Sequence, residues 1–150
     1  MKLIGRPKDG FEFQLPSREQ QLLWQLLRLY PRIPSKYQRL SKGTGLEESG
    51  QPLLEDALAE TRGQNKRALQ ALLNDPDRLK PHETGWRLKL SHGEVEWLLQ
   101  VLNDIRVGSW IRLGSPESPF KALNTQTAPD VWAMEMAGSF QMRLLEILND

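Results

Sequence analysis

Apolar and polar residues alternate in two short stretches of the chain. After Asp9 and Gly10, a dipeptide typical of hairpin turns, every second residue is apolar up to Leu15. The same alternation returns between Trp86 and Leu90. A period of two residues places one set of side chains on one face of a strand, so both stretches are predicted to be half-buried β-strands.

Four longer stretches carry apolar residues three and four positions apart, the spacing of an amphipathic helix. Ser17 with Gln20, and Ser91 with Glu94, form capping-box patterns at the start of two of them. Prolines and glycines fall between the stretches, where helices are expected to end. The predicted helices cover residues 17 to about 29, 52 to about 74, 91 to about 113, and a last stretch that begins at Thr127 or Pro129 and runs to the C-terminus.

The two halves of the chain resemble each other at an offset of 75 positions. Identical pairs at this offset include Gly10/Gly85, Glu19/Glu94, Leu27/Leu102, Glu60/Glu135 and Gly63/Gly138. One interpretation is a duplication, with repeats 1–75 and 76–150 related by a pseudo-two-fold axis; the other is two amphipathic units in coincidental register. The fold class expected is mainly α (α+β). It is a single helical domain, 1–150, with about four long helices and a small antiparallel β-hairpin.

Composition limits the function classes. The chain has 20 basic and 19 acidic residues, so its net charge of +1 gives no general case for nucleic-acid binding. It contains no cysteine, and His82 and His92 are isolated, so no metal site and no cofactor are predicted. No apolar run has the length of a signal peptide core or a membrane span, so we expect a soluble, cytoplasmic protein without membrane contact.

The predicted helix from residue 91 is apolar on almost every side, which is typical of a buried helix. Its polar residues Asn103, Asp104 and Arg106 are therefore expected inside the protein or at a seam, together with Trp97 and Trp110. One interpretation is a hydrogen-bonded network that fixes the packing, and the other is a pocket for a ligand or partner. No base or nucleophile is spaced with Asp104, so no catalytic residue is predicted.

The segment from Trp97 to Arg106, continuing to Gly114, has the order Trp-Leu-Leu-Gln-Val-Leu-Asn-Asp-Ile-Arg and then Arg-Leu-Gly. It resembles a bacterial family of unknown function whose members are encoded beside the Clp protease adaptor in actinobacteria. The resemblance implies a helical protein without established enzymology. Some members are described as redox-responsive transcriptional regulators, but this chain lacks the cysteines on which a redox response would rest.

Two further segments suggest partners. A basic run with interleaved tyrosines is a candidate nucleic-acid contact, or else a solvated connector; it comprises Arg28, Arg32, Lys36, Arg39 and Lys42. The last helix is apolar on two faces, and the face with Met134, Gly138 and Met142 is a candidate interface. The function expected is a non-enzymatic, regulatory or interaction module that binds a protein partner or forms a homodimer. The alternative is a nucleic-acid-binding regulator.

Overall fold

The computed structural model describes residues 1–34 and 51–149, except for the side chains of residues 51–55. Helices dominate this part of the chain and accompany one small antiparallel sheet, which confirms the α+β class. The elements are β1 (Lys2–Gly5), β2 (Gly10–Pro16), α1 (Ser17–Leu27), α3 (Gln51–Leu73), β3 (Leu79–His82), β4 (Gly85–Ser91), α4 (His92–Arg112), the short 3-10 helix η1 (Pro119–Ala122) and α5 (Ala128–Leu148).

The sheet has the strand order β1-β2-β4-β3, and all neighbouring strands are antiparallel. The two predicted strands, β2 and β4, form its centre. Their alternating apolar residues face the core, where Phe13 is 0 % exposed and its partner Leu88 is 3 % exposed. The two edge strands were not predicted, because β1 is very short and β3 contains Pro81, a residue that sheets tolerate at their edges.

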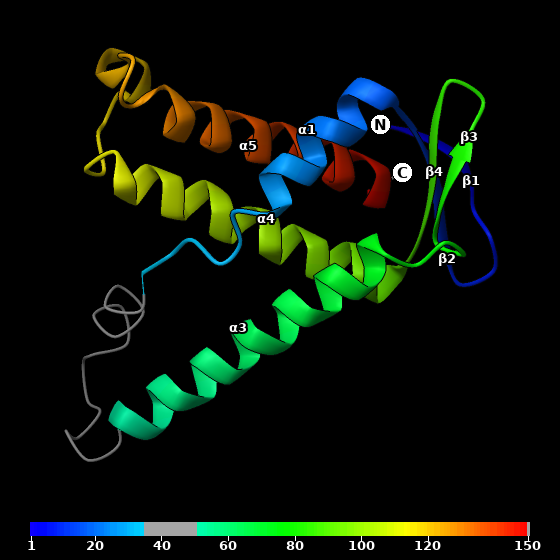
Figure 1. Cartoon of the computed structure of the whole chain (residues 1–150), viewed down its shortest axis with the longest axis horizontal. Coiled ribbons are helices and arrows are strands. Elements are labelled where there is room, and N and C mark those ends of the chain that lie inside the picture. Colours follow the sequence, from blue (N-terminus) through cyan, green and yellow to red (C-terminus); the bar gives the residue numbers. More distant parts are fainter. Residues whose placement is uncertain (35–50, 150) are drawn as a thin grey trace.

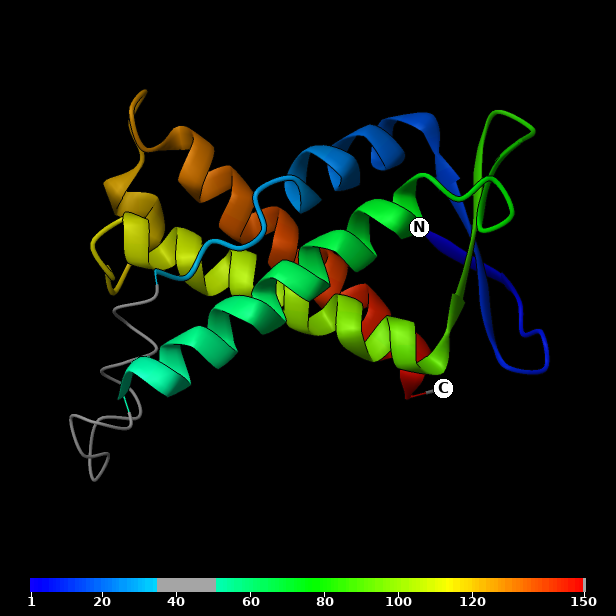
Figure 2. The same cartoon turned by 60° about the horizontal axis from the view of Figure 1, so that its bottom comes forward.

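The sheet stands at one end of a layer of helices (Figure 1). Helices α4 and α5 run antiparallel side by side, and α1 and α3 pack around them (Figures 1 and 2). The face of α4 with Leu98, Leu102 and Ile105 is buried in the core, as predicted. Helix α4 is therefore the central helix of the described structure.

The two halves repeat one order of elements. Each has two strands in a hairpin, then a helix that starts directly after the second strand, and later a long helix that returns toward the sheet. Helices α3 and α5 end at Leu73 and Leu148, again 75 positions apart. The halves differ in packing, since α5 lies closely along α4 whereas α3 crosses it (Figure 2). Descent of both halves from one ancestral unit stays a prediction.

Only one of the two predicted capping boxes forms. At the start of α4, Ser91 Oγ accepts from the Glu94 N–H at 3.1 Å, and Glu94 Oε1 accepts from the Ser91 N–H at 2.9 Å. The box predicted at Ser17 is wrong, because Pro16 occupies the capping position and the Ser17 hydroxyl donates to the Thr84 carbonyl at 3.0 Å. The Ser17 side chain thus joins the two hairpins instead of closing a helix end.

Candidate functional site

The segment after α1 crosses α4 at a glycine. A Cβ at Gly108 would lie 2.5 Å from the carbonyl carbon of Arg32, so only glycine permits this approach. The crossing brings two backbone N–H groups to Asp104, one turn earlier on α4. The N–H groups of Arg32 and Ile33 donate to Asp104 Oδ1 at 2.6 and 3.3 Å. Asp104 therefore holds the segment against the central helix.

Helix α3 joins the same junction through Arg62. Its guanidinium lies 3.3 Å from Asp104 Oδ2 and also donates to the Ile33 carbonyl. The Asn65 amide, one turn further along α3, donates to the Tyr30 hydroxyl at 3.1 Å. Both oxygens of Asp104 are thus engaged, and one carboxylate connects α3, α4 and the crossing segment.

A second ion pair ties the crossing segment to α5. The Arg32 guanidinium binds Asp130 in the first turn of α5, and Arg112 Nε donates to the same Oδ1 at 3.0 Å. The side chains of Arg32, Asp130, Arg62 and Asp104 are 12 to 15 % exposed. Partly buried charges of this kind need partners to offset their desolvation. Each of these four has an ion-pair partner, while Arg32 Nε and Arg62 Nε are buried without a hydrogen bond to the described residues. The cluster is a packing network, the first of the two interpretations given above for Asp104.

The ion pair between Arg32 and Asp130 removes one residue from the exposed part of the candidate nucleic-acid contact. Arg32 was expected in an exposed basic run, but its side chain is 13 % exposed and paired with Asp130. The reason is the crossing itself, which turns this side chain toward α5. Arg28 is exposed, whereas Lys36, Arg39 and Lys42 lie outside the described residues.

The expectation for α4 is wrong at Asn103 and Arg106. Both are exposed, and the Arg106 guanidinium donates to Asn103 Oδ1 at 3.1 Å. The sequence pattern suggested burial all round, but none of the described helices covers this side of α4. Trp97 is half-buried against the core, and Trp110 is 38 % exposed. The Trp110 indole N–H donates to the Pro116 carbonyl at 2.9 Å, which holds the ring at the surface.

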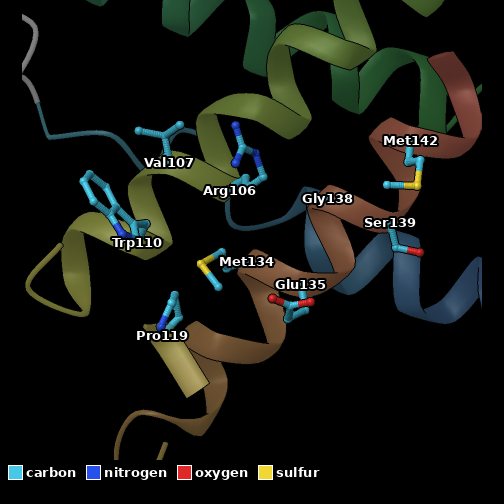
Figure 3. Close-up of a pocket in the computed structure, with 9 residues that line it drawn as sticks. All are labelled: Arg106, Val107, Trp110, Pro119, Met134, Glu135, Gly138, Ser139 and Met142. Carbon is cyan, nitrogen blue, oxygen red and sulfur yellow. The ribbon is translucent and has the colours of Figure 1, made fainter. Parts of the chain in front are cut away.

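The uncovered side of α4 forms one wall of a groove, and α5 forms the other (Figure 3). The groove has a volume of about 630 Å³. It brings together two sets of residues that the sequence singled out separately, Arg106 and Trp110 on α4 and the candidate interface on α5. The lining residues are Arg106, Val107, Trp110, Pro119, Met134, Glu135, Gly138, Ser139 and Met142.

The rim of the groove is unusually apolar for a surface. Met142 is 66 % exposed, and Leu145, one turn further along α5, is 47 % exposed. A Cβ at Gly138 would lie 3.6 Å from Arg106 Cδ, so the Arg106 side chain lies in ordinary van der Waals contact with the floor of the groove. Arg106 and Glu135 place one charge of each sign in the groove, and the described structure gives neither an ion pair with the other described residues.

The groove holds residue types that are common in protein contacts. Ser139 and Glu135 line it, but the structure shows no hydrogen bond between them and no histidine among the lining residues. Within residues 1–34 and 51–149, no group of three or more His, Cys, Asp or Glu side chains is placed to hold a metal ion. Tryptophan, methionine and arginine, by contrast, are the residue types enriched where proteins meet.

The sequence did not predict that η1, in the connection between α4 and α5, also lines the groove. Pro119 of η1 lines the groove, and Phe120 beside it is 62 % exposed. Only the fold brings η1 against both helices, so no local pattern could have placed it there. Val107 was not singled out either, because a lone valine in a helix gives no signal of a binding site.

Comparisons of this chain with protein-family models, with curated proteins and with solved structures find no match. None of the described helices combines the length and the apolar character needed to cross a bilayer. Two smaller hollows exist elsewhere. One, of about 250 Å³, lies between α1 and α3 beside Arg28 and Lys66, and the other, of about 340 Å³, lies at the β1–β2 turn. The groove between α4 and α5 is larger than both.

Proposed function

We propose that the protein is a non-enzymatic interaction module that binds a protein partner in the groove between α4 and α5. The observation that carries the proposal is the exposure of apolar side chains at that groove: Trp110 and Met142 line it, and Leu145 is exposed one turn beyond Met142 on α5. Exposed apolar patches of this kind mark contact surfaces on water-soluble folds, because leaving them in water is costly. The regulatory role suggested by the family resemblance would be exerted through such a contact.

The first half of the chain supplies an internal comparison. At the offset of 75 positions, α3 presents Arg67 where α5 presents Met142, and Gln70 where α5 presents Leu145. Arg67 and Gln70 are exposed. The corresponding helix of the first half therefore carries polar side chains at these two positions, although it packs differently against α4. Packing within the chain does not account for Met142 and Leu145, whereas a partner does.

Glycine and glutamate stand at equivalent places in both helices, at Gly63 and Gly138 and at Glu60 and Glu135. Among the residues of α5 that line the groove, Met134 corresponds to Ala59 and Met142 to Arg67, so the second helix is the more apolar at these positions. Burying an apolar side chain of this size in a contact contributes about 1.5–3 kcal/mol. Two or three such side chains around Gly138 form the kind of compact centre that dominates protein–protein affinity.

The nucleic-acid alternative is weakened by the structure of the crossing segment. Arg32 is neutralised by Asp130, so it is not free to neutralise a phosphate. Arg28 keeps an exposed charge. No observation on the described residues favours this alternative over the groove.

The test is the size of the protein in a lysate of its own host. Tagged wild-type chain is expected to elute from gel filtration in a species larger than 17.3 kDa. Met142→Lys, which places a charge in the groove, is expected to return it to the size of the free chain. Leu123→Lys is the matched control, because Leu123 is 51 % exposed but does not line the groove. Free wild-type chain, or equal behaviour of the two variants, contradicts the proposal.

A further inference from the structure

The groove face of α5 is arranged symmetrically about Gly138. Met134 lies one helical turn before this glycine and Met142 one turn after it, and all three line the groove. A two-fold contact uses the same surface on both chains, so that residue i of one chain meets residue j of the other, and j meets i. With the axis at Gly138, Met134 of each chain lies against Met142 of the other.

The same two-fold axis would also bring opposite charges of the two chains together. Arg106 contacts the floor at Gly138, and Glu135 lies one turn away on the opposite wall. Two antiparallel α5 helices crossing at Gly138 bring Glu135 of each chain toward Arg106 of the other. Two ion pairs then form from groups that have no ion pair with the other described residues. Both signs on one surface are what a self-complementary interface requires.

We infer that the occupant of the groove is a second copy of this chain, packed so that two α4–α5 pairs form a four-helix contact about a two-fold axis at Gly138. The inference rests on the proposed function, since it names the partner of the same groove. Gly138 lies at the centre of this contact, where the Arg106 side chain of the same chain packs beside it. Met134 and Met142 of both chains fill the space around it, because an unbranched side chain adapts to an irregular gap.

The first experiment is sedimentation of the purified full-length chain over a range of concentrations. The wild type is expected to reach a mass near twice 17.3 kDa. Met142→Lys is expected to weaken the dimer by roughly a hundredfold or more, since the two-fold axis places the new charge in the apolar contact twice. Leu123→Lys is expected to dimerise like the wild type. Circular dichroism on each variant shows that a change in mass does not come from unfolding.

The second experiment tests the cross-chain ion pairs by charge reversal. Arg106→Glu and Glu135→Arg are each expected to weaken the dimer by roughly five- to thirtyfold, because each change breaks two pairs. The double variant restores opposite charges and is expected to dimerise within about threefold of the wild type. Mixing the two single variants gives a further readout, because both cross-chain pairs in a mixed dimer are again of opposite sign, whereas each single variant alone pairs like charges.

A wild-type chain that stays monomeric at every concentration overturns the inference. So does a double variant as weak as the sum of its single changes, since that result removes the proposed pairing. These outcomes are distinguishable from failure of the proposed function. A monomeric purified chain that still elutes as a large, Met142-dependent species from the host lysate keeps the proposed function and excludes the second copy as the occupant.

Discussion

Phe13 on β2 and Leu88 on β4 are directly paired across the centre of the sheet, and they stand 75 positions apart in the chain. The pairing of β2 with β4 is symmetric about this point, so that Gly10 faces Ser91 and Pro16 faces Gly85. The register of the two central strands is therefore symmetric about the Phe13–Leu88 pair. Each half contributes one hairpin. The inner strand of each hairpin pairs with the inner strand of the other, so each hairpin covers the inner edge of its neighbour.

The first prediction concerns the core of α4. Leu102 is 0 % exposed, so Leu102→Ala removes buried apolar atoms and leaves a cavity. The free energy of unfolding is expected to fall by about 2–5 kcal/mol. Urea denaturation followed by circular dichroism measures it. Leu123→Ala, at an exposed position of the same residue type, is expected to stay within about 0.5 kcal/mol of the wild type. Equal effects of the two changes would show that α4 is not the central helix.

The second prediction concerns the junction at Asp104. Asp104→Ala leaves the N–H groups of Arg32 and Ile33 and the Arg62 guanidinium without their acceptor. The expected loss is about 2–4 kcal/mol of unfolding free energy, because buried donors are costly when unpaired. Asn103→Ala, on the exposed side of the same helix, is the control and is expected to change stability by less than about 0.5 kcal/mol. A harmless Asp104→Ala would contradict the role given to this carboxylate.

A pair of glycines in two helices gives the third prediction. At Gly108 an added methyl would meet the backbone of Arg32 at 2.5 Å, whereas at Gly63 it would meet only the flexible end of Arg67 at 3.4 Å. Gly108→Ala is therefore expected to destabilise the protein by about 1–3 kcal/mol. Gly63→Ala is expected to stabilise it by up to about 1 kcal/mol, because alanine favours a helix interior over glycine. Thermal unfolding of both variants checks the opposite signs, and a shared sign counts against the crossing at Gly108.

The fourth prediction concerns pH and the start of α4. Burial raises the pKa of Glu94, but hydrogen bonds from Ser91 and Arg78, together with the Arg78 charge, outweigh this effect and lower the pKa below its ordinary value. A carboxylate with a lowered folded-state pKa stabilises the fold above its unfolded value of about 4.3, and the gain is lost as the pH falls through the folded pKa. Its removal by Glu94→Gln should therefore cost most at neutral pH.

Urea unfolding between pH 7 and pH 3 measures this dependence. The stability difference between wild type and Glu94→Gln is expected to shrink once the pH falls below about 4.3. Glu96→Gln, at an exposed position of the same helix, serves as the matched control. A difference that stays constant over the whole range would mean that the ionised form of Glu94 does not support the cap.

The fold could be predicted from sequence where the signal is local. The alternation around Phe13 and Leu88 and the helical spacing from Ser91 were enough to place both central strands and α4. The local pattern failed to predict the start of α1. Pro16 occupies the capping position, and the Ser17 hydroxyl donates to Thr84 in the other hairpin. A sequence pattern shows which side chains could form a capping hydrogen bond, but the tertiary structure determines which hydrogen bond forms.

The site was predictable only in parts. Met134, Gly138 and Met142 were recognised as a surplus apolar face, and they line the groove. The pairing of Asp104 with the segment after α1 could not be foreseen, because the hydrogen-bonded residues are about 70 positions apart and meet only through the crossing at Gly108. Arg106 was expected inside the protein or at a seam, and nothing in the sequence shows which side of α4 stays uncovered.

Crosslinking inside the living cell tests the central claim, that the α4–α5 groove is a protein-binding surface, most directly. A photoreactive amino acid replaces Met142 in one strain and, in another, replaces Arg67, its exposed equivalent on α3. Irradiation is expected to produce a covalent protein adduct from position 142 and none from position 67. No adduct from position 142, or equal adducts from both positions, would contradict the account.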